Sequence, residues 1–438
     1  MDAGRLGKIP IGFAEPMDRY LVTGGTPLRG SVRVRGAKNS ALKLMAASLL
    51  APGTTRLREV PRIADIRTMQ AMLEQLGCAA RFTDGEVTID VPASIAHEAP
   101  YELVRRMRAS IIVLGPLLAR CGRARVAMPG GCNIGSRKID LHLRGLERMG
   151  ALVSSDHGYL EASGNLHGAE IVLDWPSVGA TENLLMAATL AKGTTVIENA
   201  AREPEICDLS VMLNAMCARV AGAGTPRLEI EGVDEVHPVA HTVVPDRIEA
   251  GTYLIAAAAT QGEVLVEGAR ADHLDIVLSK LADAGAEIDA GTAGIRLRQP
   301  ERARAVDFVT LPYPGFPTDL QPPMMVLSAV SEGTSIATEN VFESRFMYVD
   351  ELARMGADIR TEGHHAVIRG REVLEAAPVR APDLRAGAGL VIAGLVADGT
   401  TEVSGLEHID RGYESFEQRL SDLGANVVRE RAQQALIP

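Results

Sequence analysis

Residues 386–397 read Ala-Gly-Ala-Gly-Leu-Val-Ile-Ala-Gly-Leu-Val-Ala, and Asp398-Gly399 follows them directly. A helix of this composition is apolar on every side, which is typical of a helix that is buried on every side. The glycine predicts a turn that ends the helix, and a short strand follows. A second, amphipathic helix then ends at Gly424-Ala425. The pattern predicts one α/β unit.

The same unit occurs six times along the chain. Buried helices are expected at 41–50, 109–119, 180–191, 250–260, 320–331 and 386–397. The turns after them contain Gly53, Gly122, Gly193, Gly262, Gly333 and Gly399. The second helices end at Gly77, Gly150, Cys217, Gly285, Gly356 and Gly424. Because successive ends lie 67 to 73 residues apart, the repeat is about 70 residues long.

Six such units predict an α/β protein with two groups of three units, in which sheets enclose the buried helices. A linear solenoid is the alternative, but solenoid repeats are typically shorter, about 20 to 50 residues. The loop 237–246 separates the third unit from the fourth. The strand-like segment 19–34 precedes the first unit, and we assign it to the C-terminal group. The predicted domains are therefore 1–37 plus 246–438, and the inserted 38–245.

The composition limits the possible functions. The chain has 438 residues, more than one hydrophobic core usually supports, so two domains are expected. Its formal charge of −11 argues against nucleic acid as a partner, although a small phosphorylated ligand remains compatible. No stretch approaches the roughly 18 apolar residues of a membrane span, and residues 1–16 lack a secretory signal. We expect no membrane partner.

The chain has five cysteines, Cys78, Cys121, Cys132, Cys207 and Cys217. No C-x-x-C pair occurs, so neither a disulfide framework nor a zinc ribbon is indicated, and a reducing cytoplasm is the expected compartment. Dinucleotide, P-loop and nucleophile-elbow motifs are also missing from the sequence.

Cys132 differs from the other cysteines in its surroundings. It lies in Met128-Pro-Gly-Gly-Cys-Asn-Ile-Gly-Ser-Arg-Lys-Ile-Asp140, where glycines preclude regular structure and Arg137 and Lys138 add positive charge. Such a loop could close over a ligand. The thiol could act as a general acid or, as thiolate, as a nucleophile. A small apolar filler is the alternative, and it is our interpretation of the other four cysteines.

Charged residues stand at the start of several buried helices. Lys38-Asn39, Arg108 and Arg385 hold this position in three units, and Asp319 holds it in a fourth. Helix N-termini favour anions, so cations there could form an anion site if the helices point into a common cleft. The alternative is that each residue only caps its own helix. Asp319 could accept a proton from a substrate hydroxyl, and Arg411 in a polar turn could reach a phosphate or carboxylate.

Several motifs together resemble the enolpyruvyl transferase family, and within it the UDP-N-acetylglucosamine 1-carboxyvinyltransferases. The motifs are Gly36-Ala-Lys-Asn39, Met107-Arg-Ala-Ser110, Pro129-Gly-Gly-Cys132, Asp140-Leu-His142, Ser177-Val-Gly-Ala-Thr181, Glu198-Asn-Ala-Ala-Arg-Glu-Pro-Glu205, Pro317-Thr-Asp319 and Asp410-Arg-Gly-Tyr413. The resemblance runs from about residue 17 to 430. It implies a two-domain inside-out α/β barrel of six βαβαββ-type repeats, three per domain, with a ligand cleft between the domains.

The resemblance also implies an activity. It is transfer of the enolpyruvyl group of phosphoenolpyruvate to the 3-hydroxyl of UDP-N-acetylglucosamine, through a tetrahedral intermediate and with release of phosphate. This reaction is the first committed step of peptidoglycan synthesis. The resemblance implies no metal and no organic cofactor.

Roles carry over to matching positions. The resemblance makes Cys132 the acid, Asp319 the base, and Lys38 and Arg411 further catalytic residues. The implied contacts to phosphoenolpyruvate and phosphate are Lys38, Arg108, Arg137, Arg385 and Arg411, and Asn39 would help to position the substrates. The implied sugar-nucleotide contacts are Arg137, Lys138, Ile139, Asp140, Leu141, Trp175, Pro176, Ser177, Val178 and Val341.

Other functions remain open at this point. Lys138, Asn133, Trp175 and Cys217 depart from common family residues, so a related transferase could act on another acceptor alcohol. The enzyme that acts on 3-phosphoshikimate shares the fold but lacks the cysteine loop. A catalytically silent protein that binds a nucleotide sugar is the third alternative, and the intact set of charged residues argues against it.

Overall fold

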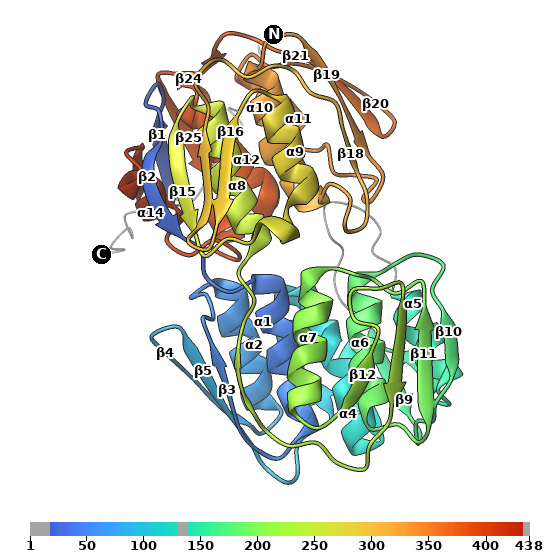
Figure 1. Cartoon of the computed structure of the whole chain (residues 1–438). Coiled ribbons are helices and arrows are strands. Elements are labelled where there is room, and N and C mark those ends of the chain that lie inside the picture. The colour runs from blue at the N-terminus through green and yellow to red at the C-terminus, as the bar shows by residue number, and fades with distance from the viewer. Residues whose placement is uncertain (1–17, 129–138, 432–438) are drawn as a thin grey trace, which may run out of the picture.

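A computed structural model describes residues 18–128 and 139–431, without the side chains of residues 105, 106 and 108. Figure 1 shows two lobes. The first two strands and the later part of the chain form the upper lobe, and the part of the chain between them forms the lower lobe. The chain passes between the lobes after strand β2 (Arg29–Arg33) and again before helix α8 (Arg247–Ala259).

In the described residues, the strands form six four-stranded sheets and one two-stranded pair. Each four-stranded sheet has one parallel edge pair, and its other pairs are antiparallel. The lower lobe contains β3 (Gly53–Arg58), β4 (Ala79–Thr83), β5 (Glu86–Val91), β6 (Glu98–Ala99), β7 (Arg123–Ala127), β8 (Leu152–Asp156), β9 (Tyr159–Ser163), β10 (Glu170–Val172), β11 (Thr194–Glu198), β12 (Arg219–Ala221), β13 (Arg227–Glu231) and β14 (Ala240–Thr242). The upper lobe contains β1 (Arg19–Thr23), β2, β15 (Glu263–Glu267), β16 (Glu287–Gly291), β17 (Gly294–Arg298), β18 (Phe308–Thr310), β19 (Thr334–Glu339), β20 (Asp358–Glu362), β21 (His365–Arg369), β22 (Leu374–Glu375), β23 (Pro378–Arg380), β24 (Ala397–Asp398), β25 (Thr400–Ser404) and β26 (Asn426–Glu430).

The strands are amphipathic because successive side chains point to opposite faces of a sheet. In β15, which reads Glu-Val-Leu-Val-Glu, Val264 and Val266 are fully buried and the three other residues are partly exposed. The buried face covers the helices, and the other face contacts solvent. The repeated unit therefore needs only a short alternating strand to enclose an apolar helix.

The N-terminal strands complete sheets of the upper lobe. β1 pairs antiparallel with β25 and β26, and β2 pairs parallel with β15. Segment 19–34, which the sequence analysis assigns to the C-terminal group, thus pairs with strands from that part of the chain. In the lower lobe, β14 supplies the parallel edge strand beside β3. Each lobe thus uses strands from distant parts of the chain.

The first helix of each unit is almost entirely buried, as predicted. These helices are α1 (Lys38–Ala47), α4 (Leu114–Cys121), α6 (Val178–Thr189), α8, α10 (Gln321–Val330) and α12 (Leu384–Leu395). In α12 every residue after Leu384 is buried. The second unit differs from the prediction, because its helix begins as the 3-10 segment η2 (Arg108–Val113) and becomes α-helical only at Leu114.

The second helices lie closer to the surface. They are α2 (Ala64–Gln75), α5 (Asp140–Arg148), α7 (Pro204–Ala215), α9 (Asp275–Asp283), α11 (Val349–Arg354) and α14 (Phe416–Asp422). The shorter segments are α3 (Tyr101–Arg106), α13 (Leu406–Ile409), η1 (Ser48–Leu50), η3 (Ala271–His273) and η4 (Thr318–Leu320).

The start of α1 corrects one prediction. The first buried helix was expected to begin at residue 41, but it begins at Lys38, and Ala37 stands before it without a side-chain cap. The backbone N–H of Lys38 instead donates to Asp246 Oδ2 at 3.0 Å. Asp246 Oδ1 also caps α8 by accepting from Ile248 and Glu249. One carboxylate thus satisfies the N-termini of two helices where the lobes join.

The buried apolar side chains form two separate cores. One is made by residues between Ala41 and Val243, and the other combines residues 20–34 with residues 248–427. We propose on this basis that the domains have the boundaries predicted from the sequence, 38–245 inserted into 1–37 plus 246–438.

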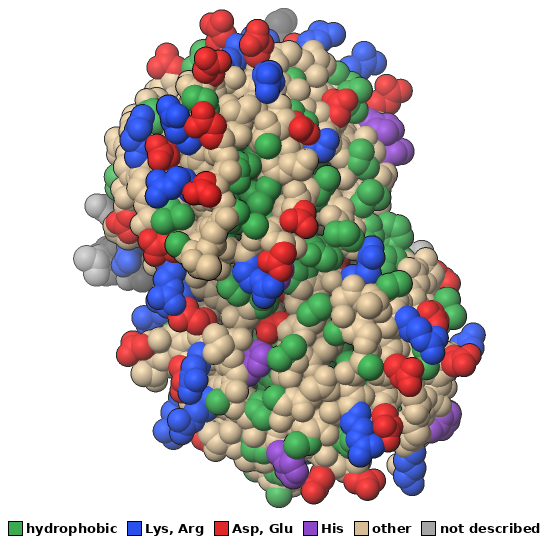
Figure 2. All heavy atoms as spheres, viewed as in Figure 1, with side chains coloured by type: hydrophobic (Ala, Val, Ile, Leu, Met, Phe, Trp, Pro, Cys, Tyr) green, Lys and Arg blue, Asp and Glu red, His purple; other side chains and the backbone are tan. Residues whose placement is uncertain are grey.

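Charged side chains are distributed over both lobes. On the face in Figure 2, Lys and Arg (blue) are interspersed with Asp and Glu (red). Among the described residues, no helix combines the length and the apolar character that crossing a bilayer requires.

Candidate active site

A buried aspartate links two of the predicted residues across the lobes. Lys38 begins α1 and Asp65 lies in the first turn of α2, both in the lower lobe, whereas Arg411 follows α13 in the upper lobe. Lys38 Nζ lies 2.8 Å from Asp65 Oδ2, and Arg411 Nε donates to Asp65 Oδ1 at 2.9 Å. Lys38 is 7% exposed and Asp65 is 2% exposed. Two cations from different lobes therefore share one buried carboxylate.

The cluster shifts the pKa values of its members. Burial is the largest cause that lowers the pKa of Lys38, and the positive charges of Arg385 and Arg411 lower it further, against the opposing effect of Asp65. Burial alone would raise the pKa of Asp65, but the charges and hydrogen bonds of Lys38 and Arg411 outweigh it and hold that pKa below its usual value. Asp65 therefore stays ionised between its two cations.

A second aspartate joins two buried arginines. Asp319 lies in η4, where its Oδ2 accepts from Arg385 Nε at 3.1 Å and its Oδ1 lies 3.4 Å from Arg345 Nη2. Arg385 and Arg345 are 3% and 2% exposed. The Arg385 guanidinium carbon also lies 5.3 Å from the ring centroid of Tyr413. Because Arg385 lowers the pKa of Lys38, the two ion-pair groups act as one electrostatic cluster.

Helix N-termini add to the positive potential of this cluster. Lys38 is the first residue of α1, and Arg385 is the second residue of α12. Asp319 precedes α10 by two residues. Helix N-termini carry partial positive charge, so the arrangement favours an anionic ligand. The predicted convergence of Lys38, Asp319, Arg385 and Arg411 is therefore present in the structure.

The segments predicted to contact the sugar nucleotide in the lower lobe lie side by side. Ile139 precedes α5, Asp140 and Leu141 begin it, and Trp175 to Val178 lead into α6. Arg144 of α5 pairs with Asp140 at 3.0 Å and with Asp174 at 2.9 Å. Ser177 caps α6 by accepting from the Ala180 N–H, while Pro176 and Val178 beside it are half-buried.

Trp175 is 41% exposed, which leaves its ring accessible at the start of α6. An aromatic ring at a helix start offers a stacking surface next to a positive dipole.

Val341 lies near Asp319 in the upper lobe. The Val341 N–H donates to Glu339 Oε1 at 2.8 Å, and Glu339 Oε2 accepts from the Thr318 hydroxyl at 2.9 Å. One carboxylate thus connects the Val341 backbone to the residue before Asp319.

Some predicted residues cannot be placed. Cys132, Arg137 and Lys138 lie outside the described residues, as does the side chain of Arg108. The side chain of Asn39 is half-buried, and its backbone carbonyl accepts from Lys43 Nζ at 2.7 Å. Among residues 18–128 and 139–431, no group of three or more His, Cys, Asp and Glu side chains is arranged to hold a metal ion.

Sequence reasoning missed Asp65, Arg345 and Asp246. Asp65 stands at the start of the second helix of its unit. Charged residues at helix starts were used to find the other site residues, and the same signal could have identified Asp65. Asp246 precedes an apolar helix, which is a common signature of an N-cap. Arg345 lies in a loop, and only the tertiary structure buries it.

Comparison with known proteins identifies the family. The sequence model of the family described as EPSP synthase (3-phosphoshikimate 1-carboxyvinyltransferase) matches residues 22–420. The chain belongs to this family. A protein of Corynebacterium jeikeium (strain K411) named UDP-N-acetylglucosamine 1-carboxyvinyltransferase is 56% identical over 413 residues, 94% of this chain and 99% of that protein. A Carboxydothermus hydrogenoformans protein named UDP-N-acetylglucosamine 1-carboxyvinyltransferase 2 is 55% identical over 416 residues, with the same coverage.

Solved structures of the EPSP synthase family and its relatives have the same fold. The crystal structure of the enolpyruvyl transferase NikO from Streptomyces tendae matches with a TM-score of 0.86 and 26% identity, and covers 95% of this chain and 100% of that chain. An EPSP synthase structure from Acinetobacter baumannii matches with a TM-score of 0.73 and 18% identity over 94% and 100% of the chains, which supports the fold alone. The predicted two-domain inside-out α/β fold is confirmed.

Proposed function

We propose that the chain is a transferase that moves the enolpyruvyl group of phosphoenolpyruvate to the 3-hydroxyl of UDP-N-acetylglucosamine and releases phosphate. The observation that carries the proposal is the 55–56% identity, over 94% of the chain, to proteins named for carboxyvinyl transfer to this sugar nucleotide. The clustered cations of both lobes support it, because both substrates are anions.

The described residues supply the electrostatic part of the reaction. The sugar hydroxyl oxygen bonds to C2 of phosphoenolpyruvate while C3 gains a proton, and the tetrahedral intermediate then loses phosphate and a C3 proton. Lys38, Arg385 and Arg411 bind the phosphate and carboxylate and offset their charge at the reacting carbon. Asp319 accepts the hydroxyl proton, because a carboxylate within reach of the reacting hydroxyl can act as a general base.

Asp65 has a supporting role in this proposal. It touches Lys38 and Arg411 and fixes the position of both side chains. When a substrate anion arrives, it meets cations that are already oriented, so little reorganisation is needed at the moment of reaction. Cys132 delivers the proton to C3 as the general acid.

The reaction assigns the protein to peptidoglycan synthesis, and thereby to cell-wall biogenesis, cell shape and cell division in a bacterial cytoplasm. Its substrates are phosphoenolpyruvate and UDP-N-acetylglucosamine, and the chemistry needs no metal and no organic cofactor.

Phosphate release tests the proposal. The protein is incubated with phosphoenolpyruvate and UDP-N-acetylglucosamine, and inorganic phosphate is measured over time. We expect release that requires both substrates and that falls by about 10²-fold or more in Asp319→Asn. Release that requires a different acceptor alcohol, or that does not need an acceptor, would reject the assigned substrate. The exposed variant Glu287→Gln is the charge-matched control and should keep the full rate.

A further inference from the structure

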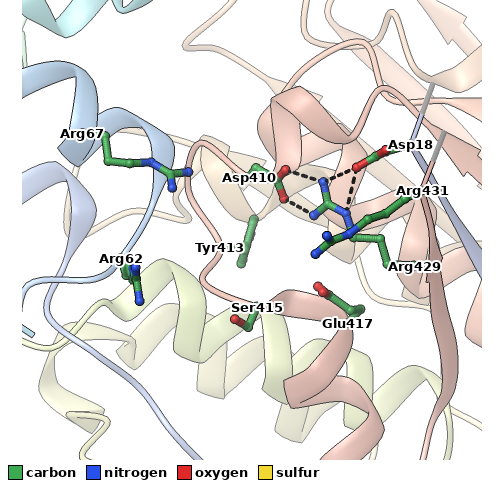
Figure 3. A pocket seen from close by; sticks show the side chains of 9 residues that line it. All are labelled: Asp18, Arg62, Arg67, Asp410, Tyr413, Ser415, Glu417, Arg429 and Arg431. Atoms are coloured by element: carbon green, nitrogen blue, oxygen red, sulfur yellow. Dashed lines mark hydrogen bonds and ion pairs between the residues drawn. The ribbon is translucent and has the colours of Figure 1, made fainter. Parts of the chain in front are cut away.

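A cavity of about 390 Å³ lies between the lobes, and none of the predicted site residues lines it. Arg62 and Arg67, from the loop before α2 and from α2 itself, lie on one side, as Figure 3 shows. Arg429 and Arg431, from β26 and the residue after it, lie on the other. Four guanidinium groups from two lobes therefore line one space.

Three carboxylates, Asp18, Asp410 and Glu417, also line this cavity. Asp410 and Asp18 both pair with Arg429, at 2.8 Å and 3.0 Å from its Nη2. Glu417, the third acid in the lining, accepts a hydrogen bond from the Tyr20 hydroxyl at 2.8 Å. Arg429, which is held between two carboxylates of the upper lobe, therefore offers no unpaired positive charge to the cavity.

The other three arginines have no carboxylate partner among residues 18–128 and 139–431. In the described parts of the chain, no hydrogen bond or ion pair reaches the side chains of Arg62, Arg67 and Arg431. Like charges that converge on one cavity repel each other, and a bound anion would remove this repulsion. Guanidinium groups match phosphate oxygens in geometry, and the volume is that of a metabolite site.

We propose that this cavity is a second anion site, which binds a small phosphorylated molecule between Arg62 and Arg67 of one lobe and Arg431 of the other. Its position couples it to the cation cluster. The Ala64 N–H donates to the Asp410 carbonyl at 2.9 Å, and the residues that follow Ala64 and Asp410 in the sequence are Asp65 and Arg411. An anion that bridges the cavity holds together the two segments that carry this ion pair, and so favours the arrangement of the lobes seen here.

Calorimetric titration of the full chain with inorganic pyrophosphate tests the proposal. The variant Arg62→Ala/Arg67→Ala removes two of the three unpaired cations. The control Arg56→Ala/Arg81→Ala removes two exposed arginines from the same lobe, away from the cavity. We expect the control to bind as the wild type does and the cavity variant to bind at least about tenfold more weakly, because each lost phosphate contact is a charge-assisted hydrogen bond.

A titration at saturating UDP-N-acetylglucosamine separates this cavity from the predicted substrate cleft. The proposal predicts that pyrophosphate still binds in the cavity when the sugar nucleotide is present. Pyrophosphate should then raise the melting temperature of the wild type but not of the cavity variant. It is overturned if the cavity variant binds pyrophosphate like the wild type, if the control loses affinity equally, or if the sugar nucleotide abolishes all binding. None of these outcomes depends on catalysis, so the proposed function is tested separately.

Discussion

Glu182 shows how one residue makes stability depend on pH. It is fully buried in α6, its Oε2 lies 3.4 Å from Lys43 Nζ, and neither carboxyl oxygen has a hydrogen bond in the described residues. Burial raises its pKa from 4.5 to about 8. Because the folded state holds this proton more tightly than the unfolded state, the contribution of Glu182 is fully present below pH 4.5 and is lost as the pH rises towards 8.

The substitution Glu182→Gln should therefore remove the part of the pH dependence of the unfolding free energy that Glu182 causes. We expect the variant to lose less unfolding free energy than the wild type between pH 5.5 and pH 8, by a few kcal/mol at most. Urea unfolding at the two pH values measures this. An equal loss in both proteins would show that Glu182 is ionised throughout. Glu161→Gln, in the exposed pair with Arg125, is the matched control.

The cysteines differ in their expected reactivity. Burial raises the pKa of Cys78 to about 11 and also raises the pKa values of Cys121 and Cys207. Since the thiolate is the nucleophile, these thiols react slowly at neutral pH. The family resemblance predicts that the epoxide fosfomycin alkylates Cys132.

Mass spectrometry of peptides after incubation with fosfomycin and UDP-N-acetylglucosamine tests this selectivity. One adduct, on Cys132, is expected in the wild type and none in Cys132→Ser. An adduct on Cys78, or no adduct at all, would contradict the assignment of Cys132 as the reactive thiol.

At the scale of elements, the end of α7 is strained. The second helices end at a residue in the left-handed region, which is glycine in five units and Cys217, with φ of +76°, in the third. A side chain there costs about 1 kcal/mol, which glycine avoids. We expect Cys217→Gly to raise the unfolding free energy by about 1 kcal/mol, measured by urea unfolding.

Gly424 provides the reverse experiment. Its φ is +91°, and an added Cβ would meet no atom within 4 Å, so Gly424→Ala tests the backbone conformation without a clash. This variant should be destabilised by about 1 kcal/mol. If Cys217→Gly is neutral or destabilising while Gly424→Ala costs stability, strain at Cys217 is not relieved by glycine and the prediction is wrong.

The elements were predictable from local sequence because their signals are local. Apolar runs and turn glycines gave α12 and α10 within two residues of their observed bounds. The start of α1 was missed because Asp246, more than 200 positions away, accepts the hydrogen bond of its first N–H. Burial by sheets on all sides explains why helices of Ala, Gly and Leu are stable without a polar face.

At the scale of the molecule, the Asp65–Arg411 pair joins the lobes. A double-mutant cycle with Asp65→Asn and Arg411→Gln should give a coupling energy of about 1 kcal/mol or more in unfolding free energy, because Asp65 is buried. The exposed pair Arg298–Glu287 should couple by less. Additive effects at Asp65 and Arg411 would mean that the contact does not hold the lobes together.

The site was predictable only in part. Lys38, Arg385, Asp319 and Arg411 were identified because charges recur at helix starts and in family motifs, and the structure brings them together. Asp65, which pairs with Lys38 and Arg411, was not identified. Asp65 and Arg411 are 346 positions apart, and a pairing over that separation leaves no local signal in the sequence. Arg345 became recognisable only through its burial beside Asp319.

The most direct test of the shared anion site is a crystal structure of the protein with UDP-N-acetylglucosamine and a non-reactive analogue of phosphoenolpyruvate. We predict that the phosphate of the analogue lies within hydrogen-bond distance of Lys38 and Arg411, with its carboxylate at Arg385 and the sugar 3-hydroxyl facing Asp319. A phosphate bound on the outer surface of either lobe, out of reach of both Lys38 and Arg411, would contradict the account.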